Sequence, residues 1–245
     1  MKKSILLLAC LVITSTISAA PSWMWIGTYG IDNYTGNGGG SNLTQSIAGA
    51  NEFMDAADVY CPLAINQMSL RDADVTRVAV CNNSTREMCD FIYFDGHGSI
   101  GSIFLGNGSN YGSVYPSGLQ LGTSYNRWAY FYTCLSLHLN AVSSWFQGFS
   151  GIRTVLGFSS LTWAVSTKEL IHNQFWDDWV NNDVSMINAH FDSCEDWLWS
   201  YYGIGIAPAM VTSDYDAYFS YDETNSAAGG EADEWVTRVC GNPEY

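Results

Sequence analysis

Phe91-Ile-Tyr-Phe-Asp95-Gly-His97-Gly98 and Trp128-Ala-Tyr-Phe-Tyr-Thr-Cys134 are the two stretches that decide the fold of this chain. Each is an apolar run of strand length that ends in a chemically active side chain. Strands of a parallel sheet buried on both faces read as such continuous apolar runs, and their carboxyl ends meet at the edge where open α/β sheets bind ligands. We therefore expect His97 and Cys134 to face one another across a cleft, as nucleophilic catalysis by a thiol requires.

The other elements alternate between strand-like and helix-like patterns, which favours an α/β fold with a mainly parallel sheet flanked by helices. Capping residues and helical spacing predict helices after Ser41, after the Ser166-Thr-Lys-Glu169 capping box and after Asp183, and a partly buried helix over residues 135–146. Further strands are predicted over residues 22–26, 75–80, 153–158, 209–211 and 217–221.

The amino-terminal segment has the layout of a secretory signal peptide. Met1-Lys2-Lys3 precedes an apolar stretch over residues 5–13 and the small residues Ser18-Ala19-Ala20. We expect residues 1–20 to be removed and residues 21–245 to form a single domain, secreted or held at the cell surface. No later segment approaches the roughly 20 apolar residues of a transmembrane helix.

Charge excludes some partners. The chain carries a formal net charge of −15, and removal of Lys2 and Lys3 with the leader changes this to −17. Nucleic acid is therefore excluded, because binding phosphates requires clustered Lys and Arg. The histidines outside the two decisive stretches lack the spacing of a zinc site, so we expect no metal and no cofactor. The acidic carboxyl-terminal segment offers oxygen ligands for calcium, but without EF-hand spacing a solvated acidic face is the simpler interpretation.

Six cysteines remain after removal of the leader, an even number that invites disulfides in an exported protein. Cys81 and Cys89 flank a polar loop and form the predicted pair, and Cys194 and Cys240 are further candidates. Sequons permit glycosylation at Asn33, Asn42, Asn82, Asn83 and Asn107.

At these residues the chain resembles the caspase-like cysteine peptidase superfamily, which includes caspases, legumains and gingipains. The resemblance lies in Gly96-His97-Gly98-Ser99, in Tyr132-Thr133-Cys134 and in the third strand within Gly151-Ile-Arg-Thr-Val-Leu-Gly-Phe158. Residues 25–29 and the helix after Asn42 are similar to an exported, uncharacterised branch of that superfamily.

The resemblance implies a three-layer sandwich and a Cys/His dyad that hydrolyses or transfers peptide bonds of a peptide or protein substrate. Cys134 would be the nucleophile and His97 the general acid and base, and the main-chain amides of Gly98 and Cys134 would face the oxyanion. Asp95 would either orient His97 or turn the end of the strand, and an Asp before Gly favours the turn. The alternative is a catalytically silent protein that assembles with copies of itself at a surface, with Cys134 a half-cystine or a buried thiol.

Overall fold

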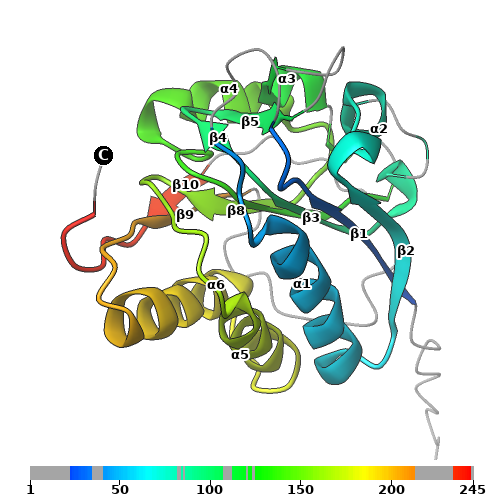
Figure 1. Cartoon of the computed structure of the whole chain (residues 1–245). Coiled ribbons are helices and arrows are strands. Elements are labelled where there is room, and N and C mark those ends of the chain that lie inside the picture. Colours follow the sequence, from blue (N-terminus) through cyan, green and yellow to red (C-terminus); the bar gives the residue numbers. More distant parts are fainter. Residues whose placement is uncertain are drawn as a thin grey trace, which may run out of the picture.

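The computed structural model describes residues 23–34, 41–81, 84, 86–106, 112–119, 121–122, 125–212 and 234–243. Within them, a seven-stranded sheet forms the middle layer, in the order β10-β9-β8-β7-β3-β1-β2 (Figure 1). Its strands are β1 (Met24–Gly30), β2 (Ala64–Arg71), β3 (Phe91–Asp95), β7 (Trp128–Tyr132), β8 (Thr154–Phe158), β9 (Pro208–Thr212) and β10 (Glu234–Thr237). The first five are mutually parallel, whereas β9 and β10 pair antiparallel, so the predicted α/β class with a mainly parallel sheet is confirmed.

Helices cover both faces of this sheet (Figure 1). One face carries α1 (Ser46–Tyr60), α5 (Lys168–Val180) and α6 (Met186–Cys194), which continues into the π-helical segment η5 (Glu195–Tyr201). The other carries α2 (Arg77–Cys81), α3 (Pro116–Leu119) and α4 (Val142–Gly148), together with a small sheet of β4 (Gly98–Ser99), β5 (Ser102–Leu105) and β6 (Gly112–Val114). Short 3₁₀ turns lie at η1 (Asp72–Asp74), η2 (Arg86–Met88) and η4 (Leu139–Ala141).

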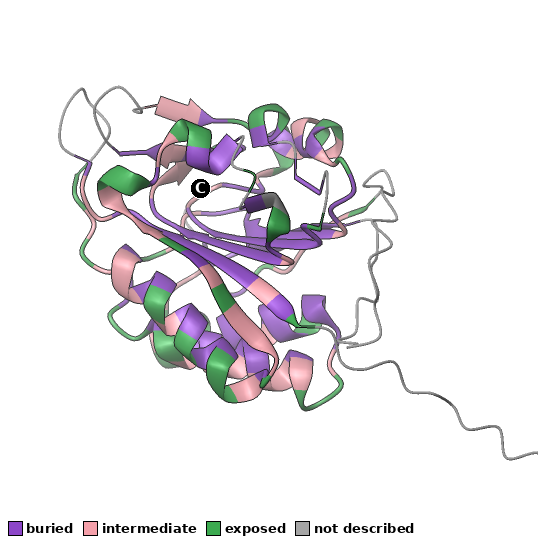
Figure 2. Cartoon of the chain, turned by 90° about the vertical axis from the view of Figure 1, so that its right-hand side faces the viewer, coloured by how far each residue is buried: buried purple, intermediate pink, exposed green. Residues whose placement is uncertain are grey.

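The continuous apolar strands follow from this two-sided coverage, because successive side chains of a strand point to opposite faces. Phe91 and Tyr93 enter the core under α1 and α5, whereas Ile92 and Phe94 enter the core on the opposite face. On α1, Phe53 stacks on Tyr93 with ring centroids 4.2 Å apart. Figure 2 shows the central strands buried along their whole length.

The strand predicted over residues 75–80 is wrong. This segment forms α2, and Thr76 starts it because its hydroxyl accepts a hydrogen bond from the amide of Ala79 at 3.1 Å. The strand beside β1 is instead β2, which the sequence analysis missed. As an edge strand it buries only Met68, so it lacks an apolar run. The strand predicted over residues 217–221 lies outside the described residues, and β10 was not predicted.

Two predicted helix starts were also wrong. Helix α1 begins at Ser46 rather than just after Ser41, because the Asp32 carboxylate accepts hydrogen bonds from the amides of Ser46 at 2.8 Å and Ile47 at 3.3 Å. The helix predicted from residue 135 begins only at α4, since Leu135 has a left-handed φ of 55° that a right-handed helix does not accommodate.

The structure contains no disulfide among the cysteines that it describes. The predicted Cys81–Cys89 bond is therefore not formed in it. Cys81 ends α2, whereas Cys89 Sγ packs under the sheet, 3.0 Å from the position that a Cβ would take on Gly27. Cys194 Sγ lies 3.8 Å from His190 Nδ1 instead of pairing with Cys240.

Several predicted features lie outside the described residues: the leader over residues 1–20 and the sequons at Asn82, Asn83 and Asn107. Of the other two sequons, Asn33 is half-buried and Asn42 is exposed. Asn42 Oδ1 accepts a hydrogen bond from the amide of Tyr34 at 2.8 Å, so this side chain helps to hold the loop beside α1. No helix within the described residues has the length and apolar character needed to cross a membrane.

Candidate active site

The ends of β3 and β7 lie side by side, with Asp95 paired to Tyr132 in the parallel register. Two residues further along each chain segment come His97 and Cys134, which line the same cavity of about 110 Å³. The segments touch, since a Cβ placed on Gly98 would lie 2.7 Å from the carbonyl oxygen of Cys134. The structure therefore brings the histidine and the thiol to one cavity at the carboxyl edge of the sheet.

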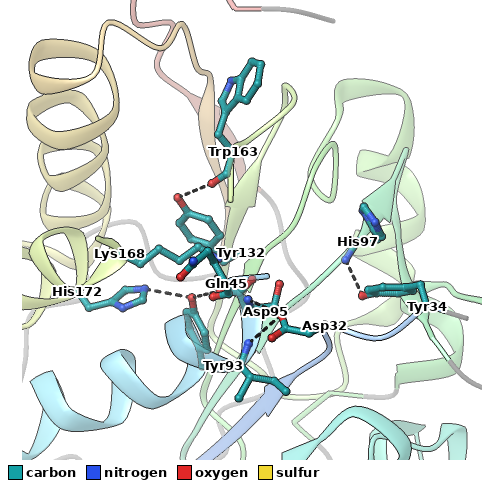
Figure 3. A network of polar contacts seen from close by, with 12 residues as sticks. Asp32, Tyr34, Gln45, Tyr93, Asp95, His97, Tyr132, Trp163, Lys168 and His172 are labelled. Atoms are coloured by element: carbon teal, nitrogen blue, oxygen red, sulfur yellow. Dashed lines mark hydrogen bonds and ion pairs between the residues drawn. The ribbon is translucent and has the colours of Figure 1, made fainter. Parts of the chain in front are cut away.

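Two hydrogen bonds hold His97, one at its ring and one at its main-chain amide. Its ring Nε2 lies 2.7 Å from the carbonyl oxygen of Ser41. Its amide donates to the Tyr34 hydroxyl at 2.7 Å, as Figure 3 shows. The Tyr34 ring also packs against the imidazole, with centroids 4.5 Å apart. A carbonyl only accepts, so Nε2 carries the proton of that hydrogen bond and Nδ1 is left as the ring atom for proton transfer.

Cys134 is half-buried, and its sulfur contacts the main chain of Thr162. Sγ lies 3.3 Å from the Thr162 carbonyl oxygen and 3.4 Å from the Thr162 amide nitrogen. Burial raises the pKa of the Cys134 thiol, and the Thr162 amide and the Lys168 ammonium oppose this rise. The sulfur is therefore a neutral thiol at neutral pH, and its use as a nucleophile requires a base. Leu135, which follows it, has the left-handed φ noted above, a conformation often found at functional sites.

The Asp95 carboxylate has a partner other than His97. No hydrogen bond between this carboxylate and the imidazole occurs among the described residues, and Asp95 Oδ2 instead forms an ion pair with Lys168 Nζ at 2.5 Å (Figure 3). Both side chains are almost fully buried, at 1% exposure for Lys168 and 2% for Asp95. Burial raises the pKa of Asp95, and the ammonium opposes that rise. The His97 imidazole instead contacts the Ser41 carbonyl, a partner that was not predicted from the sequence.

The ion pair continues into a buried chain of polar groups. The Tyr93 hydroxyl donates to Asp95 Oδ2 at 3.1 Å and lies 3.0 Å from His172 Nε2 on α5. Lys168 was not predicted as a site residue, because it lies inside the predicted capping box. Helix α5 in fact begins at Lys168, without a side-chain cap from Thr167. A cation is unfavourable at a helix amino terminus, and that mismatch was the signal available in the sequence.

The model of one protein family, described as a domain of unknown function (DUF6345), matches residues 71–197, just over half of the chain. The chain belongs to the DUF6345 family. The matched segment of this DUF6345 protein includes His97, Cys134 and Lys168. Among curated proteins, none matches the chain by sequence.

The solved structures similar to this DUF6345 protein include cysteine proteases. A secreted C11 cysteine protease from Bacteroides thetaiotaomicron, called iotapain, aligns with a TM-score of 0.51 and 7% identity, over 79% of this chain and 67% of the protease. A secreted C11 protease from the same organism, in complex with an irreversible peptide inhibitor, aligns with a TM-score of 0.50 and 10% identity, over the same shares. At such low identity these matches show a common caspase-like fold and no more.

Within the described residues, no group of three or more His, Cys, Asp and Glu side chains is arranged to hold a metal ion. The cavity is lined by the Cys134 thiol and by the His97 imidazole, whose Nε2 is held by a main-chain carbonyl. These are the groups that acyl transfer through a thioester uses.

Proposed function

We propose that this DUF6345 protein is an exported cysteine peptidase, with Cys134 as the nucleophile and His97 as the general acid and base. The observation that carries the proposal is that both side chains line one cavity, with His97 fixed by Ser41 in the tautomer that leaves Nδ1 for proton transfer. The fold shared with the secreted proteases supports it. Export is proposed from the leader-like residues 1–20.

The reaction proceeds in two halves. His97 Nδ1 accepts the Cys134 proton, and the thiolate attacks the scissile carbonyl carbon to form a tetrahedral intermediate, whose oxyanion would be held by the amides of Gly98 and Cys134. As the carbon–nitrogen bond breaks, the imidazolium gives its proton to the leaving amine and a thioester remains. Water then adds to the thioester with His97 as base, which releases the acid and restores the thiol.

Alkylation of the folded protein with iodoacetamide, followed by mass spectrometry, tests the pair directly. Cys134 is expected to react first, because of the six described cysteines it is the one that is not buried. His97→Ala should slow this reaction at neutral pH, where the thiol depends on its base, and the rate should recover at high pH. His138→Ala is the matched control, since the His138 ring contacts the amide of Asn140 and lies outside the cavity lining.

Turnover is measured on a library of internally quenched peptides, with Cys134→Ser as the control for a contaminating protease. The proposal is refuted if Cys134 stays unlabelled while buried cysteines react, or if His97→Ala leaves both the labelling rate and its pH dependence unchanged. If Cys134 reacts in a His97-dependent way but no peptide is cleaved, the result would favour the catalytically silent assembly protein over the peptidase.

A further inference from the structure

The cavity beside Cys134 also contains a pair of charged groups, Asp95 and Lys168, that the proposed reaction does not use. Asp95, Ser46, Tyr132 and Lys168 line it together with the thiol and the imidazole. A buried carboxylate in such a place would be a binding site for a cationic side chain. In this chain the carboxylate already has a cation, because Lys168 reaches it from the first turn of α5 (Figure 3).

The surroundings of Lys168 are built to hold its side chain in that place. Its ammonium lies 4.5 Å from the centre of the Tyr132 ring and 3.5 Å from the Gln45 carbonyl oxygen. Gly49 on α1 leaves room for the pair, since a Cβ there would overlap the Asp95 carboxylate and lie 2.7 Å from Lys168 Cδ. Aromatic, carbonyl and carboxylate groups around one ammonium are the partners that a bound lysine side chain requires.

We propose that Lys168 occupies, from within the chain, the place where a cationic substrate side chain would bind, so that the cavity selects an uncharged side chain next to the scissile bond. This inference rests on the proposed function and names the substrate class of that site. A second cation in the cavity would meet Lys168 as a like charge with its carboxylate already paired. Apolar groups from Leu43, Tyr132, Trp163 and Ala164 line the rest of the space.

The size of the cavity indicates which uncharged side chains of a substrate fit into it. The cavity measures about 110 Å³ and is partly open to solvent. A small uncharged side chain such as that of alanine, serine, threonine or valine therefore fits, and Lys168 is the residue that determines this specificity.

The first experiment needs no peptidase activity. Lys168→Ala removes the side chain beyond Cβ, and n-propylammonium has the size and charge of the missing part. We expect n-propylammonium to raise the melting temperature of Lys168→Ala in proportion to the logarithm of its concentration above saturation. It should leave the wild type and Lys168→Ala/Asp95→Asn unchanged, because the first has its cation and the second has no carboxylate to receive one.

If Lys168→Ala does not fold, the inference can still be tested on the wild type. Binding of n-propylammonium to the wild type, detected by titration calorimetry and lost after Cys134 is alkylated, would overturn the inference, because the cation site would then be open. Failure of folded Lys168→Ala to respond to n-propylammonium would overturn it as well.

The second experiment compares peptides that differ only in the residue before the scissile bond. The wild type should cleave after alanine at least about 100-fold faster than after lysine, and Lys168→Ala should reduce that ratio by about tenfold or more. Equal cleavage after lysine by the wild type would refute the specificity and leave the peptidase intact. If no peptide is cleaved while n-propylammonium stabilises Lys168→Ala, the proposed function fails and the self-filled cation site stands.

Discussion

Acidification from pH 6.5 to pH 4 should destabilise the fold through His190. This side chain is fully buried on α6, and its Nε2 lies 3.1 Å from the Gly157 carbonyl oxygen. Burial lowers the pKa of His190 to about 4, against an ordinary value of 6.5 in the unfolded chain. Between these values the unfolded chain binds a proton that the folded chain does not, so stability is complete above pH 6.5 and falls as the pH drops toward 4. The two pKa values differ by about 2.5, which corresponds to a loss of about 3 kcal/mol as the pH falls through this window.

Urea unfolding followed by tryptophan fluorescence at half-unit steps from pH 4 to pH 7.5 measures this loss. His190→Gln is the control, because its amide can donate to the Gly157 carbonyl but does not titrate. Buried carboxylates contribute equally to both proteins, so the difference between the two pH profiles isolates the histidine. Between pH 6.5 and pH 4 the wild type should lose about 1 kcal/mol more per pH unit than the variant, and above pH 6.5 this difference should level off. Parallel profiles would refute the assignment of a neutral, buried His190.

Three further predictions follow from packing and burial. Gly49→Ala should lower the free energy of unfolding by about 1–3 kcal/mol, because the new Cβ displaces the buried ion pair. Gly118→Ala is the control for the same urea titration and should be tolerated, because its Cβ would meet only an atom 4.0 Å away. Equal effects of the two substitutions would contradict the packing argument. Tyr34→Phe removes the hydroxyl that accepts the hydrogen bond from the His97 amide. It should lower kcat on a cleaved peptide roughly tenfold, equivalent to about 1.4 kcal/mol in the activation barrier, with KM little changed. An unchanged kcat would show that this hydrogen bond does not position the imidazole. Burial raises the pKa of Cys194 to about 12, so iodoacetamide at pH 8 should label it only in urea, and rapid labelling of the folded protein would show that this core opens.

The central strands could be predicted from sequence because they are buried on both faces. β3, β7 and β8 read as apolar runs, and the residues at their carboxyl ends indicated the place of the site. The edge of the sheet could not be predicted in this way. β2 is half-exposed and mixes polar with apolar residues, so it gives a weak strand signal. The segment that forms α2 is richer in β-branched residues and gave the stronger strand signal. It is nevertheless a helix, which lies off the sheet and begins at the Thr76 cap.

The residues of the candidate site also differ in whether the sequence could predict them. Cys134 and His97 were predictable because each ends a strand, and neighbouring parallel strands fix where their ends meet. The groups that surround them come from distant parts of the chain. Lys168 lies 73 positions from its partner Asp95, and no local pattern links a helix start to a strand end so far away.

The hydrogen bond between His97 and residue 41 has a consequence for how this protein can be studied. Its acceptor is a peptide carbonyl, which all twenty amino acids supply. Alanine scanning would therefore report position 41 as silent, and related chains are free to vary there while keeping the same contact. Only a change to the backbone itself, such as a proline that moves the loop or an ester that weakens the acceptor, would expose how much the imidazole depends on it.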